Sequence, residues 1–439
     1  MIEILLIGLL FIYRYVWRLN FFNPAFLILI VWTIGYICYL MFPTLYAIEF
    51  ETKAIVGAYL ILFSLTSILI QGIFKRYTTC PRININTISY VNEKLLIFLN
   101  YLAVFGGIFY IYRYVSLYIS IGDLSYYFYL VRSSALLGES LIDNSGRLMG
   151  NLPSFSMIIF VILFYVYLNK KTKNYNSHYK FLLIVGFLSS SLMQLVEGAR
   201  SGLVQYLLIL FAIYFLSGRT LTKKFIGYFS LIVFLFGVIS VFSRIHTDDK
   251  NIFEIAYLIM EHIVLYAYGS LKSIDYFFNE NIFISHGTFY GYISSIDQFL
   301  ELFMLNKLDI KLSIEQMQFV EIGPDLFTNV YSFLAVYIFY FGFLGTVLTI
   351  IGVSIVVTII YQLKNNHSIF LLLYAVIVPA IILTTFHDYF FAYIPYFVRV
   401  VLLSILIFYK FKIDIKSIIR EIRFYIEVRK ESILKKLSY

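Results

Sequence analysis

The chain has 439 residues, of which 61% are hydrophobic and 13% are charged, whereas a soluble domain has about 25% charged residues. The hydrophobic fraction is too large to be buried in one soluble core. It therefore excludes a soluble enzyme, a nucleic-acid-binding module and a disordered chain. It predicts an all-α, polytopic integral membrane protein. The net charge of +9 then reports on topology, since Lys and Arg collect in cytoplasmic loops.

Apolar stretches of about 20 residues, the length that crosses a bilayer as a helix, recur along the chain. A shorter apolar segment, 327–341, precedes a Phe-Gly-Phe-Leu-Gly break at 341–345. It is either a separate span or a short surface or re-entrant helix. The predicted spans are 2–19, 25–46, 53–74, 95–117, 152–168, 181–196, 201–217, 223–243, 342–362, 368–386 and 390–409.

Charge in the connecting segments decides the topology. Basic residues dominate the loops 75–94, 169–180 and 218–224 and the tail 410–439, which alone carries nine Lys/Arg. The loop 244–326 has twelve Asp/Glu against five Lys/Arg, a net charge of −7. The basic segments are expected in the cytoplasm and the acidic loop outside. This arrangement favours eleven spans, an outer N-terminus, an inner C-terminus and a segment 327–341 that does not cross alone.

The chain is therefore expected to form one membrane domain over 1–439 with a large outer loop at 244–326. Two stretches of that loop, 254–272 and 293–305, carry isolated acids on apolar helical patterns and predict amphipathic helices lying on the membrane or against the bundle. The tail 410–439 alternates basic and apolar residues. That pattern predicts an amphipathic helix on the anionic inner leaflet.

Two arginines fall within or near the predicted spans, where a charge is costly and calls for a reason. Arg399 lies near mid-depth of the last span, four residues after Pro395. It either pairs with a carbonyl or an acidic neighbour, or serves as a functional cation facing a cavity. Arg113 lies near the outer end of the fourth span, where it either snorkels to the headgroups or contacts a ligand.

The segment Glu197-Gly-Ala-Arg200-Ser-Gly202 is the sharpest local motif. It forms a tight outer turn in which Gly198 and Gly202 flank Arg200, so that the backbone can approach a ligand closely. It also begins a helix, where free N–H groups and the helix dipole favour an anion. A phosphate docked here would meet both the arginine and the helix terminus. The alternative is an ordinary helical hairpin with an interfacial arginine.

The other candidates lie on the predicted outer face. Its remaining cations are the minority that could hold an anion on an otherwise acidic face; they are Arg132, Arg147, Arg244, Lys250 and Lys272. Its histidines include His286, which has a glycine beside it, and His387, whose neighbour Asp388 gives it the parts of a general base. Adjacent residues do not face each other on a helix, so that pair is only suggestive. No metal-binding motif, P-loop or dinucleotide fingerprint is present.

Together these features resemble the Wzy-type polysaccharide polymerases, the oligosaccharide repeat unit polymerases of bacterial O-antigen and capsule assembly. The resemblance rests on many spans, the Gly-Ala-Arg-Ser-Gly turn and one long outer loop in the second half. After that loop come Asp325-Leu-Phe-Thr-Asn329-Val-Tyr331 and then Phe341-Gly-Phe-Leu-Gly345 at the start of an apolar span. The family usually has an acid just before that glycine. Tyr340 and Phe341 stand there instead, so no acid is carried over.

The resemblance implies a GT-C-like, inverting and metal-independent glycosyltransferase of the bacterial inner membrane, with its active site outside and no cofactor. Its substrates would be undecaprenyl-diphosphate-linked oligosaccharides, and its partners membrane lipids, a chain-length regulator and a flippase, but no nucleic acid. Arg200, Arg113 and Arg399 would contact the diphosphate. Arg132, Arg147, Arg244 and Lys272 are second choices, supported by Gly198, Gly202 and Asn329. His286, His387 and Asp325 are the candidate catalytic bases or sugar ligands.

Two other functions compete with this hypothesis. An O-antigen ligase shares the donor and the architecture but transfers the chain to lipid A core. A lipid-linked-oligosaccharide flippase or secondary transporter belongs to another class. Transporters typically show paired repeats and discontinuous helices near the midplane, and the sequence shows no internal repeat.

Overall fold

The computed structural model of this chain is mostly helical. The described part contains seven helices that are long and apolar enough to cross a membrane, which confirms a helical membrane protein. It also contains two short strands, which the all-α prediction missed. The structure describes residues 2–41, 46–77, 90–122, 127, 151–169, 177–196, 200–219, 227, 254, 257, 269–279, 320–324, 326–328 and 330–409.

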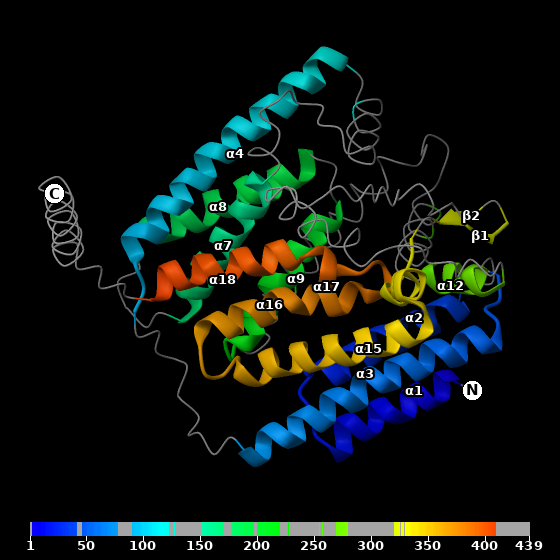
Figure 1. The fold of residues 1–439 in the computed structure, drawn as a ribbon. Helices are drawn as coiled ribbons and strands as arrows, with labels where there is room; N and C mark the ends of the chain where they lie inside the picture. Colours follow the sequence, from blue (N-terminus) through cyan, green and yellow to red (C-terminus); the bar gives the residue numbers. More distant parts are fainter. Residues whose placement is uncertain are drawn as a thin grey trace, which may run out of the picture.

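A first group of helices contains the N-terminal part of the chain (Figure 1). Helix α1 (Ile2–Phe11) runs into a π-helical turn, η1 (Ile12–Val16). Helices α2 (Pro24–Met41) and α3 (Phe50–Tyr77) follow, and the much later α15 (Phe333–Leu363) packs against both. Small polar residues line the α3–α15 contact. They include Ser67, whose hydroxyl accepts a hydrogen bond from Thr358 at 2.8 Å; such bonds join helices in lipid.

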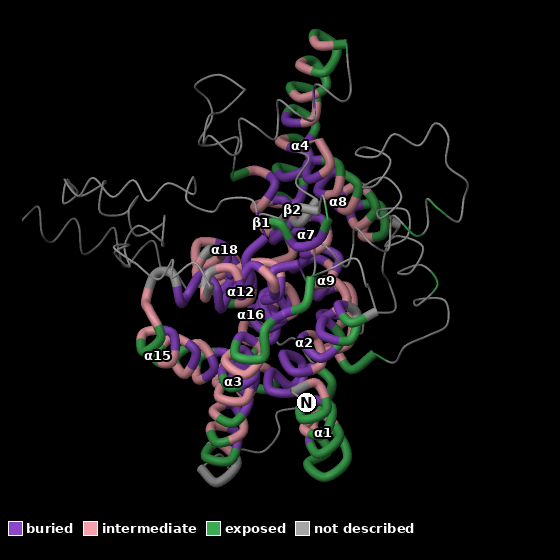
Figure 2. Tube along the Cα trace, turned by 90° about the vertical axis from the view of Figure 1, so that its right-hand side faces the viewer, coloured by how far each residue is buried: buried purple, intermediate pink, exposed green. Residues whose placement is uncertain are grey.

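A second group lies on the other side of the molecule (Figure 1). It contains α4 (Glu93–Ile121), α7 (Leu152–Asn169), α8 (Ser177–Val196) and α18 (Ile394–Phe408). Helix α4 packs along α7 and α8, and its free end projects beyond them with exposed residues (Figure 2).

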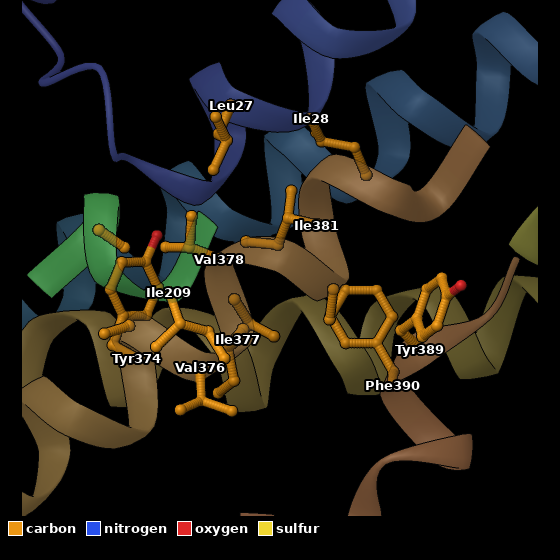
Figure 3. Close-up of a cluster of buried hydrophobic side chains, with 14 of the residues drawn as sticks. Leu27, Ile28, Ile209, Tyr374, Val376, Ile377, Val378, Ile381, Tyr389 and Phe390 are labelled. Carbon is orange, nitrogen blue, oxygen red and sulfur yellow. The ribbon is translucent and has the colours of Figure 1, made fainter. Parts of the chain in front are cut away.

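Two helices join the groups at the centre of the molecule. Helix α9 (Arg200–Leu216) and helix α16 (Ser368–Ile382) pack against each other, and α16 also contacts α2, α15 and α18. All residues of α16 from Leu371 to Ile381 are buried, as expected for a helix that is apolar all round. Figure 3 shows its side chains between those of α2 and α9. After α16 come η3 (Leu383–Thr385) and the one-turn α17 (Tyr389–Ala392).

Helix α15 is broken near its start, at Gly342. This residue has φ 63° and ψ −175°, a conformation that is essentially restricted to glycine. The helical part before it, from Phe333, has nine residues and a length of about 13 Å, too short to cross a core of about 30 Å. Residues 333–338 are buried. Within the segment 327–341, residues 327 and 328 thus belong to β2, and the helical part from Phe333 to 341 cannot cross alone.

The acidic loop 244–326 contributes three described elements. Helix α12 (Ser270–Asn279) precedes two antiparallel strands, β1 (Val320–Gly323) and β2 (Leu326–Thr328). The sheet is joined to the segment after α2 by the Tyr46 N–H, which donates to the Ile322 carbonyl at 2.8 Å. The segments 293–305 and 410–439, most of 254–272 and the predicted span 223–243 lie outside the described residues.

The helices share two ends. We call the end at which α12 and the strands lie the α12 end, on the right of Figure 1. At the opposite end, the Asn92 N–H donates to the Ile407 carbonyl at 2.9 Å and the Tyr165 hydroxyl donates to Ser368 at 3.0 Å. The described boundaries of the predicted basic segments, at the ends of α3, α7, α9 and α18 and the starts of α4 and α8, lie at this opposite end (Figure 1). The acidic loop joins the bundle at the α12 end.

Candidate functional site

Arg399 lies on α18 and is held at the start of α7. Its Nη2 donates a hydrogen bond to Oδ1 of Asn151 at 2.5 Å, and Asn151 is the residue just before α7. The Arg399 side chain thus reaches the start of α7, while its backbone lies near the middle of the candidate span Tyr389–Phe408, as the sequence predicted. The short helix α17 precedes α18, which begins at Ile394.

No carboxylate among the described residues pairs with the Arg399 guanidinium. An amide oxygen supplies a hydrogen bond but no formal charge. The positive charge therefore remains uncompensated within this part of the structure. Such a guanidinium favours an anion, and its planar fork suits the oxygens of a phosphate or a carboxylate.

Two tyrosines lie between α17 and Arg399. Tyr393 directly follows α17, and Tyr396 lies on the first turn of α18. Tyr396 is 5% exposed, and the charge of Arg399 acts electrostatically on its hydroxyl. The ring of Tyr393 lies against Tyr396, with centroids 6.1 Å apart in an edge arrangement. The Tyr393 hydroxyl in turn lies beside the side-chain amide of Gln205 on α9. A continuous polar row thus runs from α9 across α18 to α7.

Gly202 brings the end of α8 into the same region. A Cβ at this position would lie 2.0 Å from Oε1 of Gln194. The glycine leaves room for the Gln194 amide, which would have to move if residue 202 carried a Cβ. Gln194 and Gln205 are both buried. We call the resulting set the Arg399 cluster; it consists of Asn151, Gln194, Gly202, Gln205, Tyr393, Tyr396 and Arg399.

Two donors of the Arg399 cluster are unpaired. Nε2 of Gln205 and the hydroxyl of Tyr396 are buried and have no hydrogen-bond partner among the described residues. Buried polar groups are nearly always paired. The cluster therefore combines a cation with two neutral donors, an arrangement suited to a polar ligand rich in acceptor oxygens.

Arg200 is the first residue of α9, two positions before Gly202. Its backbone therefore lies at the edge of the Arg399 cluster, so the predicted anion-binding turn and Arg399 meet at the same end of the bundle. The side chain of Arg200 and the residue Gly198 lie outside what the structure describes.

Comparisons with known proteins assign no family. No protein-family model, no curated protein and no solved structure matches this chain. The chemistry of the Arg399 cluster must therefore be argued from its own geometry.

His387 and Asp388 lie next to each other but are not oriented as a pair. The Asp388 carboxylate is fully buried and accepts the Tyr337 hydroxyl at 2.9 Å and the Phe390 N–H at 2.9 Å. It therefore caps α17. Burial lowers the pKa of His387, opposed by the charge of Asp388 and a hydrogen bond to the backbone of Tyr331. The imidazole is thus neutral at pH 7 and engaged with the backbone.

Lys272 on α12 is engaged with protein groups. Its Nζ donates to the Ala47 carbonyl at 2.9 Å and forms a close ion pair with the fully buried Asp275. Asp275 also accepts the Thr52 hydroxyl at 2.6 Å and the Glu49 N–H at 3.2 Å. These contacts attach α12 to the start of α3. They also occupy N–H donors of the Lys272 ammonium that would otherwise be free to bind an anionic substrate.

Arg113 lies on an exposed part of α4. Its neighbours Tyr110 and Tyr114 pack toward Met193 on α8. The structure thus gives Arg113 no contact with the Arg399 cluster, and its placement suits a side chain that reaches toward headgroups. The other predicted site residues lie outside the described residues: Arg132, Arg147, Arg244, His286, Asp325 and Asn329.

Sequence reasoning missed most members of the Arg399 cluster. The available signal was two glutamines inside apolar stretches, Gln194 and Gln205, on either side of the Gly-Ala-Arg-Ser-Gly turn. Polar side chains in spans are often functional. Tyr393, Tyr396 and Asn151 carried no such signal among 40 tyrosines and many loop asparagines. Among the residues described, no group of three or more His, Cys, Asp or Glu side chains could hold a metal.

Proposed function

We propose that this chain is a membrane glycosyltransferase that polymerises undecaprenyl-diphosphate-linked oligosaccharide repeat units into O-antigen or capsular polysaccharide. The observation that carries the proposal is the Arg399 guanidinium, which is held by Asn151 and has no carboxylate partner in the described part of the chain. A diphosphate would supply the missing negative charge. The buried donors of Gln205 and Tyr396 beside it could bind further oxygens of the same ligand.

The Arg399 cluster would bind the diphosphate of the donor, together with Arg200 at the start of α9. Helix N-termini favour anions through their free N–H groups. In the reaction, a hydroxyl oxygen of the acceptor sugar bonds to the anomeric carbon of the donor from the opposite face. The bond between that carbon and the diphosphate oxygen breaks, and the diphosphate leaves with the electron pair. The arginines stabilise this departing charge in place of a metal.

The hydroxyl proton passes to a general base. His387 is a weak candidate because its imidazole is partly buried and hydrogen-bonded to the Tyr331 backbone. We therefore favour His286 or Asp325, both in or next to the acidic loop 244–326. Lys272 is reassigned to a structural role, since it is engaged with Asp275 and Ala47.

The α12 end would face the outside of the bacterial inner membrane, where lipid-linked repeat units are delivered. The basic segments 75–94, 169–180, 218–224 and 410–439 would then lie in the cytoplasm, in agreement with the positive-inside rule. A flippase would supply the substrates and a chain-length regulator would act on the growing polymer.

A transporter for lipid-linked oligosaccharides is the alternative from another class. The breaks in α15 at Gly342 and between α16 and α18 support it to a degree, because transporters use discontinuous helices. However, these breaks lie at the α12 end, whereas transporter breaks lie near the midplane. An O-antigen ligase is separated from a polymerase by its acceptor.

The proposal is tested by polymer formation in cells whose own copy of this gene is deleted. Arg399→Gln and Arg200→Ala should abolish the polysaccharide ladder at an unchanged level of membrane protein, because the leaving diphosphate loses its cation. Arg219→Gln is the matched control. Arg219 is at the opposite end, where it donates to the Leu168 carbonyl at 2.5 Å, and its loss should leave the ladder normal.

A normal ladder from Arg399→Gln would overturn the proposed site. The deletion strain distinguishes the polymerase from the ligase. If it still attaches single repeat units to its lipid, the chain is a polymerase. If it attaches none, the chain acts at the ligation step.

A further inference from the structure

Some buried polar side chains elsewhere in the bundle are hydrogen-bonded, unlike the two unpaired donors of the Arg399 cluster. Gln71 on α3 is buried like Gln205, but its amide exchanges two hydrogen bonds with Asn23, at 2.7 and 3.2 Å, and donates a third to Ser67. Similarly, the buried hydroxyls of Tyr206 and Tyr374 are hydrogen-bonded, Tyr206 to Ser190 and Tyr374 to the Phe22 carbonyl. Other buried groups outside the Arg399 cluster have no partner among the described residues, including the hydroxyls of Tyr36 and Tyr39 and Nδ2 of Asn100.

Gln205 and Tyr396 are distinguished by their surroundings, because both belong to the cluster that contains the Arg399 guanidinium. Gln205 is 4% exposed and Tyr396 is 5% exposed, and each has a donor atom without a partner in the described residues. They approach each other through Tyr393, which lies beside both. Two unpaired buried donors in one cluster are unfavourable for folding. A bound ligand that supplies acceptors to both donors would remove this penalty.

The neighbourhood determines the chemistry of this ligand. Arg399 attracts the anionic part of a ligand, whereas an amide N–H and a phenol O–H are neutral donors that suit hydroxyl and ring oxygens. Sites that hydrogen-bond a substrate hydroxyl reject analogues without it, because their own buried groups are then left unpaired. Both donors lie next to the cation, so they would contact the part of the substrate attached to the phosphate.

We propose that Gln205 and Tyr396 bind the first sugar of the lipid-linked donor, the sugar joined directly to the diphosphate. The inference rests on the proposed function, in which Arg399 holds that diphosphate. Gln205 and Tyr396 then determine which sugar is accepted. Tyr393 positions the Gln205 amide, and Gly202 sets the distance between α8 and α9 by permitting the contact with Gln194.

The test compares two probes on the purified full-length chain in detergent. Farnesyl diphosphate carries the diphosphate without a sugar, and the undecaprenyl-diphosphate-linked oligosaccharide carries both. Tyr396→Phe and Gln205→Leu should each weaken binding of the oligosaccharide probe about tenfold, the usual effect of losing one net hydrogen bond. Binding of farnesyl diphosphate should not change. Affinities follow from the rise in unfolding temperature with probe concentration.

Folding is monitored in the same experiment. Removing an unpaired buried hydroxyl relieves a desolvation penalty, so Tyr396→Phe should unfold at or above the temperature of the unmodified chain. Tyr36→Phe on α2 is the matched control, because its hydroxyl is also buried and unpaired in the described structure but lies in the other helix group. It should leave the affinities for both probes unchanged.

The outcomes separate this inference from the proposed function. If Arg399→Gln does not weaken binding of farnesyl diphosphate, the proposed diphosphate site fails. If Arg399→Gln weakens both probes while Tyr396→Phe and Gln205→Leu weaken neither, the sugar site fails and the diphosphate site stands. Equal weakening of both probes by Tyr396→Phe would also overturn the sugar site, because it would indicate a general distortion.

Discussion

Three charged residues in the helical bundle show how differently single side chains are stabilised. Asp388 is fully buried and is satisfied by Tyr337 and the backbone of α17. Asp275 is satisfied by Lys272 and Thr52. Arg399 has an amide partner but no described carboxylate. Arg399 is only partly buried, and its guanidinium has no counter-charge among the described residues, so it is the residue of the three that an anionic ligand would best explain.

The buried imidazole of His387 predicts a pH dependence of stability. Burial lowers its pKa in the folded chain, while in the unfolded chain the value is about 6.5. Below about pH 6.5 the unfolded state therefore binds more protons, and stability is lost as the pH falls. We expect the unfolding temperature in detergent to drop between pH 7.5 and pH 5.5, and His387→Gln to reduce that drop. Identical drops for both chains would contradict the assignment.

At the scale of elements, the break in α15 divides a buried helical segment from the span that follows it. The Tyr59 hydroxyl donates to the Phe343 carbonyl at 3.3 Å just after the break, while Thr346 bonds to the Gly342 carbonyl at 2.7 Å. Carbonyls freed by a kink need such partners in lipid. The break thus lets the preceding segment bring Tyr337 to Asp388 beside the start of α17.

Replacing Gly342 should be costly for a purely backbone reason. A Cβ there would meet nothing within 4 Å, but φ 63° with ψ −175° is strained for any other residue by about 1–3 kcal/mol. Gly342→Ala should therefore lower the unfolding temperature by several degrees. Gly352 in the same helix also has open space around it but no positive φ, so Gly352→Ala should not lower the unfolding temperature. Equal effects would show that the conformation of Gly342 is not required.

The helix boundaries were largely predictable, whereas the contacts between helices were not. Apolar length alone placed 152–168 and 342–362 within a residue or two of α7 and of the span Phe341–Leu363, because bilayer thickness fixes helix length. Hydropathy carries no information on which helices meet. The arginines stood out as charges in apolar surroundings. Tyr396 and Asn151 did not, because their role arises only when α7, α9 and α18 pack together.

At the scale of the whole molecule, the fold separates the predicted charge classes. The described boundaries of the basic segments lie at one end of the bundle, and α12 and β1–β2 lie at the other, together with the start of α7 at the Arg399 cluster (Figure 1). If the basic segments lie in the cytoplasm, as the positive-inside rule predicts, the Arg399 cluster would face outside. The cluster lies between helices of the second group and the central α9, near the start of α7 rather than deep within the bundle.

This orientation predicts opposite accessibility for two engineered cysteines. With Cys38 and Cys80 replaced by serine, Pro324→Cys between β1 and β2 should react with a membrane-impermeant maleimide added to intact spheroplasts. Lys173→Cys in the basic segment 169–180 should react only after the membrane is permeabilised. Reaction of Lys173→Cys in intact spheroplasts would reverse the orientation.

The most direct test is the reaction of the purified chain in liposomes with undecaprenyl-diphosphate-linked oligosaccharide in the presence of EDTA. We predict a ladder of longer oligosaccharides with matching release of undecaprenyl diphosphate, and the loss of both in Arg399→Gln. Movement of the lipid-linked oligosaccharide between leaflets without any new glycosidic bond would contradict a transferase and establish a transporter.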